Sequence, residues 1–151
     1  MKITLIAGAR PNFMKIAPLI HQIIKKSHIE IARRHAVNLH MAPLPEYRGC
    51  NQFSHAIIDK KGTFGTTLHI MTEGIDDGGI LLERRFDMLK YNDVKSLYTR
   101  TYNETLILFR ESLAKLENFE FIIIEQKELV QDRGTELNYR SSIKKLKEID
   151  L

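Results

Sequence analysis

The sequence has few of the features that mark secreted, membrane-embedded or metal-dependent proteins. It contains one cysteine, Cys50, and no tryptophan in 151 residues. A single cysteine cannot form an internal disulfide or join a cysteine-based zinc site, so we interpret Cys50 as a packing residue in a reducing compartment. No apolar run approaches the roughly 20 residues that a membrane helix requires, and the N-terminus lacks the pattern of a secretory signal. We therefore expect a cytoplasmic protein with no membrane contact and no bound metal.

Composition and charge describe an ordinary globular chain. Hydrophobic residues make up 43% of the sequence and charged residues 28%, which suits one compact unit with an apolar core. The net charge of +4 comes partly from a basic cluster near the C-terminus, formed by Arg140, Lys144, Lys145 and Lys147. We interpret this cluster as a solvated helix face. A contact with the phosphate of a nucleotide or a tRNA is the alternative, although no nucleic-acid motif accompanies the cluster.

The order of apolar runs and helical patterns predicts an α/β unit. Compact apolar or β-branched runs predict strands, and apolar residues recurring at three- and four-residue spacing predict helices. The expected strands are 2–7, 35–40, 66–71, 80–86 and 119–124, and the expected helices are a segment with apolar residues from Met14 to Ile24, 52–58, 94–116 and a short basic helix at 141–149. We expect 66–71 and 80–86 to pair antiparallel, and 126–138 to form a polar connection.

The strongest helical pattern lies between residues 94 and 116. Its apolar positions are Leu97, Tyr98, Tyr102, Leu106, Phe109, Leu113 and Leu116. This spacing predicts an amphipathic helix with those side chains on its apolar face.

Three polar residues form a candidate catalytic group. Asn38 and His40 are two positions apart on an expected strand, so their side chains share one face. A proline-containing loop follows His40 and keeps the end of that strand open, which is where ligands bind in open α/β sheets. Asp76 lies in a glycine-rich turn that can approach a ligand closely. An amide, an imidazole and a carboxylate together supply what acyl transfer needs.

These residues alone leave the function open. An Asn-x-His pair on a strand is more often structural than catalytic. The sequence around the three residues is more specific. Residues 37–49 contain Asn-x-His-x-x-x-Leu-Pro-x-Tyr-Arg-Gly, and residues 65–79 contain Thr-x-His-x-x-x-Glu-Gly-x-Asp-x-Gly. Both patterns, in this order, resemble the formyltransferase family, and the resemblance covers roughly residues 35–125.

The family includes methionyl-tRNA formyltransferase, glycinamide ribonucleotide transformylase and the sugar N-formyltransferases, all of which use N10-formyltetrahydrofolate. The resemblance implies that Asn38 and His40 stabilise the tetrahedral intermediate when an amine attacks the formyl carbon. It implies that Asp76 sets the protonation of His40 and helps to remove the amine proton. Asp77 is the alternative to Asp76, because the doubled aspartate leaves the alignment ambiguous by one residue.

Further residues in the same segments are candidates for binding the folate or the substrate. His69 matches a position often occupied by histidine in the family, and its alternative is a packed or surface-facing strand histidine. Arg48 can touch a ligand or hold its own loop by bonds to carbonyl groups. The complete set of binding candidates is Tyr47, Arg48, Gly49, His69, Glu73, Asp77 and Gly78.

The N-terminus departs from the family pattern. Residues 8–20 contain Gly-Ala-Arg-Pro and resemble the opening of the UDP-N-acetylglucosamine 2-epimerases. That resemblance implies a phosphate contact for Arg10, close to a helix N-terminus. We therefore expect an epimerase-like strand, turn and helix over residues 1–28 and a formyltransferase-like catalytic core over residues 29–151.

In the resembling family a longer Rossmann-like sheet precedes the Asn-x-His strand. The expected fold is thus a partial Rossmann-like formyltransferase fold, a mixed sheet with flanking helices, truncated at its N-terminal side. A parallel sheet that lacks strands exposes apolar faces and an unpaired edge. Either the epimerase-like segment covers this surface or two chains associate as a homodimer.

The resemblance favours formyl transfer from N10-formyltetrahydrofolate to the primary amine of a nucleotide-linked amino sugar. Methionyl-tRNA formyltransferases carry a further C-terminal β-barrel for which this chain has no room, so tRNA is not the expected partner. The alternatives are a catalytically inactive remnant of a formyltransferase, a methionyl-tRNA formyltransferase-like protein, and a nucleotide-binding module built on Arg10.

Overall fold

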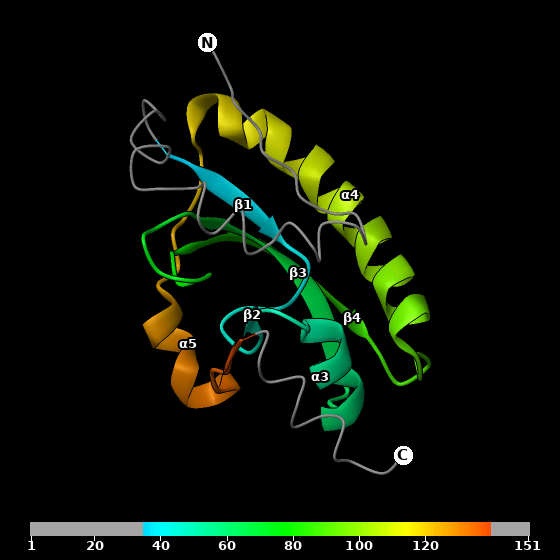
Figure 1. The fold of residues 1–151 in the computed structure, drawn as a ribbon. Helices are drawn as coiled ribbons and strands as arrows, with labels where there is room; N and C mark the ends of the chain where they lie inside the picture. The colour runs from blue at the N-terminus through cyan, green and yellow to red at the C-terminus, as the bar shows by residue number, and fades with distance from the viewer. Residues whose placement is uncertain (1–34, 140–151) are drawn as a thin grey trace.

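A computed structural model describes residues 35–139 of the chain. The expected strand 2–7, the helix from Met14 to Ile24, the Arg10 turn and the basic helix 141–149 lie outside the described residues. Within them, two small sheets and three helices form a mixed α/β fold, as the sequence predicts (Figure 1).

Three antiparallel strands form the main sheet, in the order β1-β3-β4. They are β1 Val37–His40, β3 Thr63–Ile70 and β4 Ile80–Asp87. The predicted antiparallel pairing of the last two strands is confirmed. The register of the first two places Asn38 opposite His69. A bulge between Leu68 and His69 interrupts the pairing of β3 with β4 near the candidate site.

A second sheet joins segments far apart in the sequence. Strand β2, Arg48–Gly49, pairs in parallel with β5, Leu137–Asn138. The expected polar connection 126–138 is therefore wrong, because it contains this strand and the helix α5, Gln126–Arg133. Helix α5 carries polar side chains around most of its circumference, so it has no apolar stripe from which the sequence could predict it.

The predicted strand 119–124 is also not found. In the structure this segment contributes one isolated bridge, between Ile124 and Ile80. Each of these residues donates its backbone N–H to the carbonyl of the other, at 2.8 and 2.9 Å. The bridge fastens the chain to the start of β4 directly before α5 begins. An apolar run of the right length is therefore not sufficient for a strand, which also needs a neighbour along its length.

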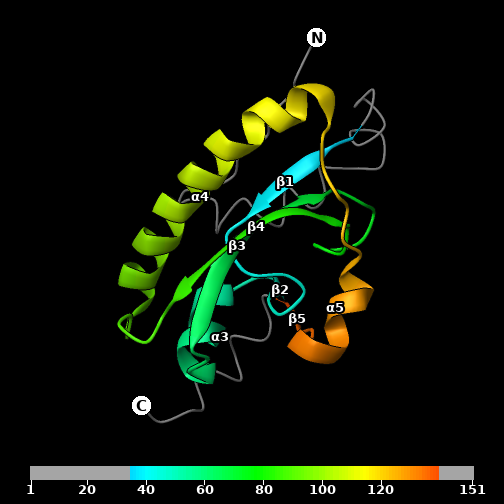
Figure 2. The same ribbon diagram turned by 180° about the vertical axis from the view of Figure 1, so that it is seen from behind.

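Helix α4, Val94–Asn118, confirms the predicted helix but turns an unexpected face to the sheet. It packs on β3 and β4, and in both views α4 and α5 lie to either side of the main sheet (Figures 1 and 2). Only Leu97 of the predicted apolar face is buried, whereas Tyr102, Leu106 and Leu113 are about 40% exposed. The buried residues are Leu97, Thr101, Glu104, Thr105, Leu108 and Ser112.

Polar side chains are accommodated beneath α4 because they find partners there. The Thr105 hydroxyl donates to the Thr66 hydroxyl on β3 at 2.9 Å, and Glu104 pairs with Arg84 of β4 at 2.7 Å. Buried polar groups cost little once they are hydrogen-bonded, so a threonine-rich face can replace an apolar one.

The larger core cluster lies under the loop that follows β1. It consists of Ala42, Tyr47, Ala56, Phe64, Phe86, Met88 and Leu97. Helix α3, Gln52–Asp59, supplies Ala56 and packs against α4. The Tyr47 ring lies 5.5 Å from that of Phe64, and its hydroxyl donates to Asp59 at 2.9 Å. The loop is therefore anchored at its far end, which holds the groups next to His40 in place.

None of the described helices is both long enough and apolar enough to cross a bilayer.

Candidate active site

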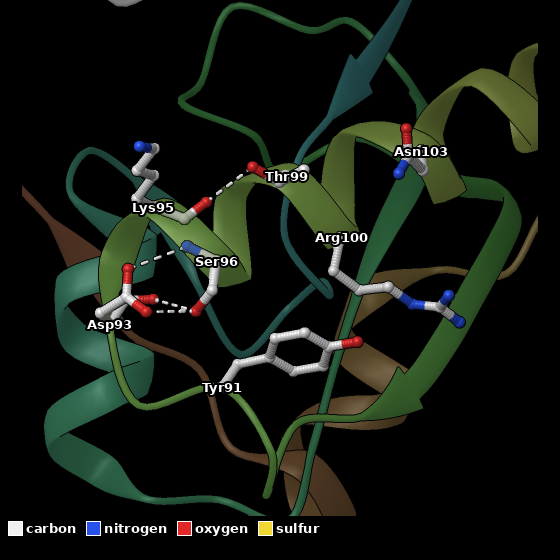
Figure 3. A pocket seen from close by; sticks show the side chains of 7 residues that line it. All are labelled: Tyr91, Asp93, Lys95, Ser96, Thr99, Arg100 and Asn103. Carbon is white, nitrogen blue, oxygen red and sulfur yellow. Dashed lines mark hydrogen bonds between the residues drawn. The ribbon is translucent and has the colours of Figure 1, made fainter.

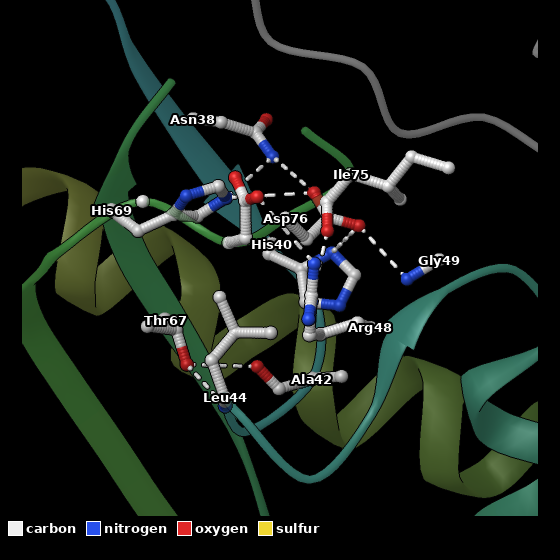
Figure 4. A network of polar contacts seen from close by, with 12 residues as sticks. Asn38, His40, Ala42, Leu44, Arg48, Gly49, Thr67, His69, Ile75 and Asp76 are labelled. Atoms are coloured by element: carbon white, nitrogen blue, oxygen red, sulfur yellow. Dashed lines mark hydrogen bonds and ion pairs between the residues drawn. The ribbon is translucent and has the colours of Figure 1, made fainter. Parts of the chain in front are cut away.

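Neighbouring strands bring Asn38, His40 and His69 together. The first two share a face of β1 because strand side chains alternate. His69 comes from β3, directly opposite Asn38. The Asn38 amide Nδ2 donates to His69 Nε2 at 3.1 Å (Figure 4). Sheet register alone thus places an amide and two imidazoles side by side.

Asp76 reaches this group from the turn between β3 and β4. Its backbone φ is 47°, in the left-handed region that non-glycine residues seldom adopt. Two hydrogen bonds hold it there. The Gly49 backbone N–H donates to Asp76 Oδ2 at 3.0 Å, and the Gln126 side-chain amide donates to the Asp76 carbonyl at 2.8 Å. These contacts offset a conformational cost of roughly 1–2 kcal/mol.

Two of the three predicted catalytic residues, Asn38 and His40, lie close to the carboxylate of the third, Asp76. His40 Nδ1 lies 3.7 Å from Asp76 Oδ2, and Asn38 Nδ2 lies 3.5 Å from Oδ1 (Figure 4). His69 Nε2 is a fourth member of the group, 3.6 Å from Oδ1. The carboxylate side chain is 18% exposed, so the cluster is mostly shielded from solvent but still reachable.

Backbone carbonyl groups determine which nitrogen of each imidazole carries the proton. His40 Nε2 lies 2.7 Å from the Tyr47 carbonyl, which can only accept, so Nε2 is the donor. Nδ1 is then the nitrogen that faces Asp76 and gains or loses a proton. His69 is arranged the other way. Its Nδ1 donates to the Ile70 carbonyl at 2.8 Å, which leaves Nε2 to accept from Asn38.

The electrostatics favour a neutral His40 beside an ionised Asp76. Burial lowers the pKa of His40 below its usual value, and the opposing attraction of Asp76 does not reverse this. Burial by itself would raise the pKa of Asp76, but the neighbouring His40 and His69 and the Gly49 N–H together hold that pKa below its ordinary range. Titratable groups whose pKa values are shifted by burial and by a specific charged partner are a recurring property of catalytic sites.

His69 is buried, with 2% of its surface exposed, so it is not the surface-facing histidine that the sequence left open. It contacts both Asn38 and Asp76 within the cluster. Its predicted contact with folate or substrate stays a prediction.

Arg48 and Asp77 lie on the outer side of the same turn. Arg48 Nε donates to the Ile75 carbonyl at 2.9 Å, and its Nη2 lies 3.7 Å from Asp77 Oδ2. Arg48 thus joins its own loop to the turn by a carbonyl contact, and its predicted contact with a ligand stays a prediction. Asp77 is 40% exposed, and its contacts are with Arg48 and with the Thr72 hydroxyl, from which it accepts a hydrogen bond.

The other binding candidates have local structural tasks. Tyr47 takes part in the site through its backbone carbonyl, since its ring is buried. Gly49 has φ 83°, and an added Cβ would approach the Asn138 carbonyl oxygen to 2.2 Å. A Cβ on Gly78 would meet the Ile70 carbonyl oxygen at 1.9 Å. Glu73 is exposed on the turn. Their predicted contacts with a ligand stay predictions.

Three residues that support the site were not identified from the sequence. Thr66 and Thr67 donate to the carbonyl groups of His40 and Ala42, at 3.0 and 2.8 Å, and so fix the end of β1. Their place in the Gly-Thr-Thr-x-His motif was a usable signal. Gln126, 50 residues after Asp76, lies in no motif and carried no such signal.

A shallow hollow of about 550 Å³ lies elsewhere, at the N-terminal end of α4 (Figure 3). Its lining residues are Tyr91, Asp93, Lys95, Ser96, Thr99, Arg100 and Asn103. None of them belongs to the cluster around Asp76. The Asp93 carboxylate already caps the helix by accepting from the Ser96 N–H at 2.9 Å. One N–H group of the first turn of α4 is therefore capped within the chain.

Comparison with known proteins identifies the family of the sequence. The sequence matches the formyl transferase family over residues 4–113. The match starts inside the segment 1–28, for which an epimerase-like opening is expected. That segment lies outside the described residues, and its likeness to an epimerase stays a prediction.

Curated relatives include sugar and tRNA formyltransferases. GDP-perosamine N-formyltransferase of Brucella melitensis is 31% identical over 104 residues, covering 69% of this chain and 40% of the relative. Methionyl-tRNA formyltransferase of Caldicellulosiruptor saccharolyticus is 31% identical over 97 residues, covering 64% of this chain and 31% of the relative. The chain thus spans less than half the length of either relative.

Solved structures share the fold. A sugar N-formyltransferase from Shewanella superposes with a TM-score of 0.67 at 26% identity, covering 78% of this chain and 45% of that chain. The formyltransferase PseJ from Anoxybacillus kamchatkensis superposes with a TM-score of 0.68 at 22% identity, covering 82% of this chain and 63% of that chain. With the sequence match and the arrangement around Asp76, the conclusion is that this chain belongs to the formyl transferase family.

Proposed function

We propose that the chain transfers a formyl group from N10-formyltetrahydrofolate to the primary amine of a nucleotide-linked amino sugar. The observation that carries this proposal is the convergence of Asn38, His40 and Asp76, with His40 Nδ1 3.7 Å and Asn38 Nδ2 3.5 Å from the carboxylate. In this proposal those three residues are catalytic.

The reaction joins the amine nitrogen to the formyl carbon, breaks the bond from that carbon to N10, and moves one proton from the amine to N10. The folate supplies only the activated formyl group. A site for this reaction must accept the amine proton and stabilise negative charge that develops on the formyl oxygen.

The residues present suit these two tasks. The ionised Asp76 attracts the amine proton, and His40 Nδ1 is the nitrogen able to take it up, because Nε2 is committed to the Tyr47 carbonyl. The Asn38 contact with Asp76, at 3.5 Å, is at the limit of hydrogen bonding. That amide hydrogen is therefore available to the formyl oxygen at little cost, while the contact with His69 keeps the amide oriented.

Related structures support the choice of donor and acceptor. A formyltransferase from Helicobacter canadensis was solved with folinic acid and dTDP-3-aminofucose. The PseJ structure contains tetrahydrofolate and a UDP-linked formamido sugar. Methionyl-tRNA formyltransferases also match this chain, so a tRNA substrate is the second candidate. A catalytically inactive formyltransferase remnant, the other alternative that the sequence left open, is the third.

The test is an assay of purified protein with N10-formyltetrahydrofolate and, in separate reactions, GDP-perosamine, dTDP-3-aminofucose and methionyl-tRNA. Mass spectrometry of the sugars and acid gels of the tRNA detect the formylated products. We expect product with a nucleotide sugar and none with methionyl-tRNA, and a turnover about a thousandfold lower for His40→Ala. Product only with tRNA would replace the substrate, and no product with any amine at saturating donor would contradict the activity.

Calorimetry with 5-formyltetrahydrofolate separates an inactive remnant from an enzyme whose amine is still missing from the panel. Binding without turnover points to another amine, whereas the absence of binding points to the remnant. A UDP-induced rise in melting temperature would favour the nucleotide-binding module.

A cytoplasmic location and a homodimer stay predictions. Light scattering after size-exclusion chromatography measures whether the protein is a homodimer.

A further inference from the structure

Helix α5 contacts both the turn that carries Asp76 and the loop that follows His40. Its first residue, Gln126, contacts the turn that carries Asp76. Its last residue, Arg133, contacts the loop that follows His40, through the Leu44 carbonyl at 3.4 Å. The helix is therefore a rigid connection of eight residues between the two sides of the cluster.

The contact at Gln126 uses both hydrogens of one side-chain amide. Its Nε2 donates to the carbonyl groups of Asp76 and Gly78, each at 2.8 Å. Gln126 is 6% exposed, so water does not replace these bonds easily. The Asp76 carbonyl belongs to the peptide unit that follows the left-handed Asp76, and the Gly78 carbonyl lies two peptide units further along the same turn. Because the backbone conformation directs the side chain, the Gln126 amide helps to aim the carboxylate at His40.

The backbone directly before Gln126 is itself held in place. Two backbone hydrogen bonds between Ile124 and Ile80 tie the preceding residues to β4. Gly79 packs so closely that an added Cβ would lie 2.4 Å from the Ile123 side chain. The backbone that carries the Gln126 side chain is thus held close to the start of β4.

A line of charged side chains fixes the other end of α5. Arg133 Nη1 lies 3.0 Å from Glu83 Oε2, Glu83 contacts Arg85 at 2.9 Å, and Arg85 contacts Glu46 at 2.6 Å. Glu46 belongs to the loop whose Tyr47 carbonyl holds His40 Nε2. This end of α5 is therefore connected to the imidazole, as the first end is connected to the carboxylate.

We propose that Gln126 is a positioning residue that sets the separation between the Asp76 carboxylate and the His40 imidazole. It touches no reacting atom and acts through the backbone of the turn. The inference rests on the proposed function for its kinetic readout, but its structural readout does not. A merely stabilising Gln126 would lower the melting temperature and leave the properties of His40 unchanged.

The test compares Gln126→Met with Asp93→Ala. Methionine keeps the length and burial of the side chain and removes both donors. Asp93→Ala removes the cap of α4, away from the cluster, and is a control for a general loss of stability. We expect Gln126→Met to lower kcat on the order of tenfold to a hundredfold, the size of effect that small misplacements of catalytic groups have, with KM for the amine little changed. Asp93→Ala should leave kcat and KM as in the wild type.

NMR titration of His40 in the protein without ligands provides the second readout. The charged or titratable side chains facing this imidazole are Asp76 and His69. If the carboxylate moves away in Gln126→Met, the imidazolium loses its counter-charge and His40 titrates at lower pH than in the wild type. The control variant should titrate like the wild type. The acid side of the rate profile should shift in the same direction.

Each outcome supports or overturns the positioning role of Gln126. An unchanged His40 titration in Gln126→Met, or an equal change in Asp93→Ala, would overturn the positioning role. If the wild type transfers no formyl group, the proposed function fails while the titration still tests Gln126. If Gln126→Met does not fold, Gln126→Asn provides the same comparison, because its amide is too short to hold both carbonyl groups.

Discussion

The inner and outer sides of the turn between β3 and β4 carry neighbouring carboxylates in opposite surroundings. On the inner side, Asp76 is 18% exposed and is held by the Gly49 N–H. On the outer side, Asp77 is 40% exposed, 3.7 Å from Arg48 and hydrogen-bonded by Thr72. The same side chain thus faces a buried imidazole at one position and solvent at the next. Chemistry at this turn is determined by the partners of each carboxylate and not by its type.

The two sides also differ in how firmly they are held. On the inner side, each contact involves a backbone group. The Gly49 N–H donates to the Asp76 carboxylate, and the Asp76 carbonyl accepts from the Gln126 side chain. On the outer side, Arg48 donates to the Ile75 carbonyl, and the contacts of Asp77 with Arg48 and Thr72 are more exposed. Exposed ion pairs contribute about 0–1 kcal/mol and weaken with salt. We therefore expect substitutions on the inner side to affect catalysis and those on the outer side to affect it little.

Replacing the imidazole tests the inner side most severely. We expect His40→Ala to reduce kcat by about a thousandfold, because both the proton acceptor and its contact with Asp76 are lost. The protein should remain folded, as circular dichroism and thermal melting would show. Formyl transfer within tenfold of the wild type would remove His40 from the mechanism.

Exchanging each aspartate for asparagine compares the two sides directly. Asp76→Asn keeps the shape and removes the charge beside His40, so kcat/KM should fall on the order of a hundredfold. Asp77→Asn should change it by less than about threefold, because its charge is largely exposed. Steady-state kinetics with the same amine measures both. Equal losses, or a larger loss at Asp77, would reverse our assignment of the catalytic carboxylate.

The pH dependence of stability sharpens the description of the inner side. Because the pKa of folded His40 is lowered, the unfolded chain binds a proton first as the pH falls below about 6.5. Stability should therefore decrease between about pH 6.5 and the lower pKa of the folded state. Asp76 acts in a lower window: its stabilisation is present above about pH 3.9 and is lost as the pH falls towards its depressed folded pKa.

Thermal melting of the wild type and of His40→Asn from pH 7.5 to pH 5 measures the histidine contribution. Asparagine does not titrate, so the variant should show a flatter dependence on pH than the wild type. Parallel curves for the two proteins would show that His40 has the same pKa in the folded and unfolded chain.

The smallest effect is expected for Arg48→Met on the outer side. The substitution removes the hydrogen bond to the Ile75 carbonyl and the contact with Asp77. We expect a loss of about 1 kcal/mol in unfolding free energy or less, and unchanged KM values for folate and amine. Urea unfolding and steady-state kinetics provide the measurements. A raised KM for either substrate would instead assign Arg48 to ligand binding.

Local patterns in the sequence predicted those features that depend on near neighbours. The two-residue period of a strand placed Asn38 and His40 on one face, and the three- and four-residue spacing identified α4. The same spacing predicted that a different face of α4 would pack on the sheet, and that prediction was wrong. The reason is that Thr105 and Glu104 find hydrogen-bonding partners on β3 and β4, which no periodicity can reveal.

The sequence by itself determined the motif, the strand face and the set of chemical groups that can meet there. Tertiary structure alone decided which aspartate reaches His40, which nitrogen of the His40 imidazole is free, and that Gln126 joins the site. These features depend on groups that are distant in the sequence: the Tyr47 carbonyl lies 7 residues after His40, and the Gln126 side-chain amide lies 50 residues after Asp76. A hydrogen bond acts only over about 3 Å, so contacts between distant segments exist only once the chain has folded.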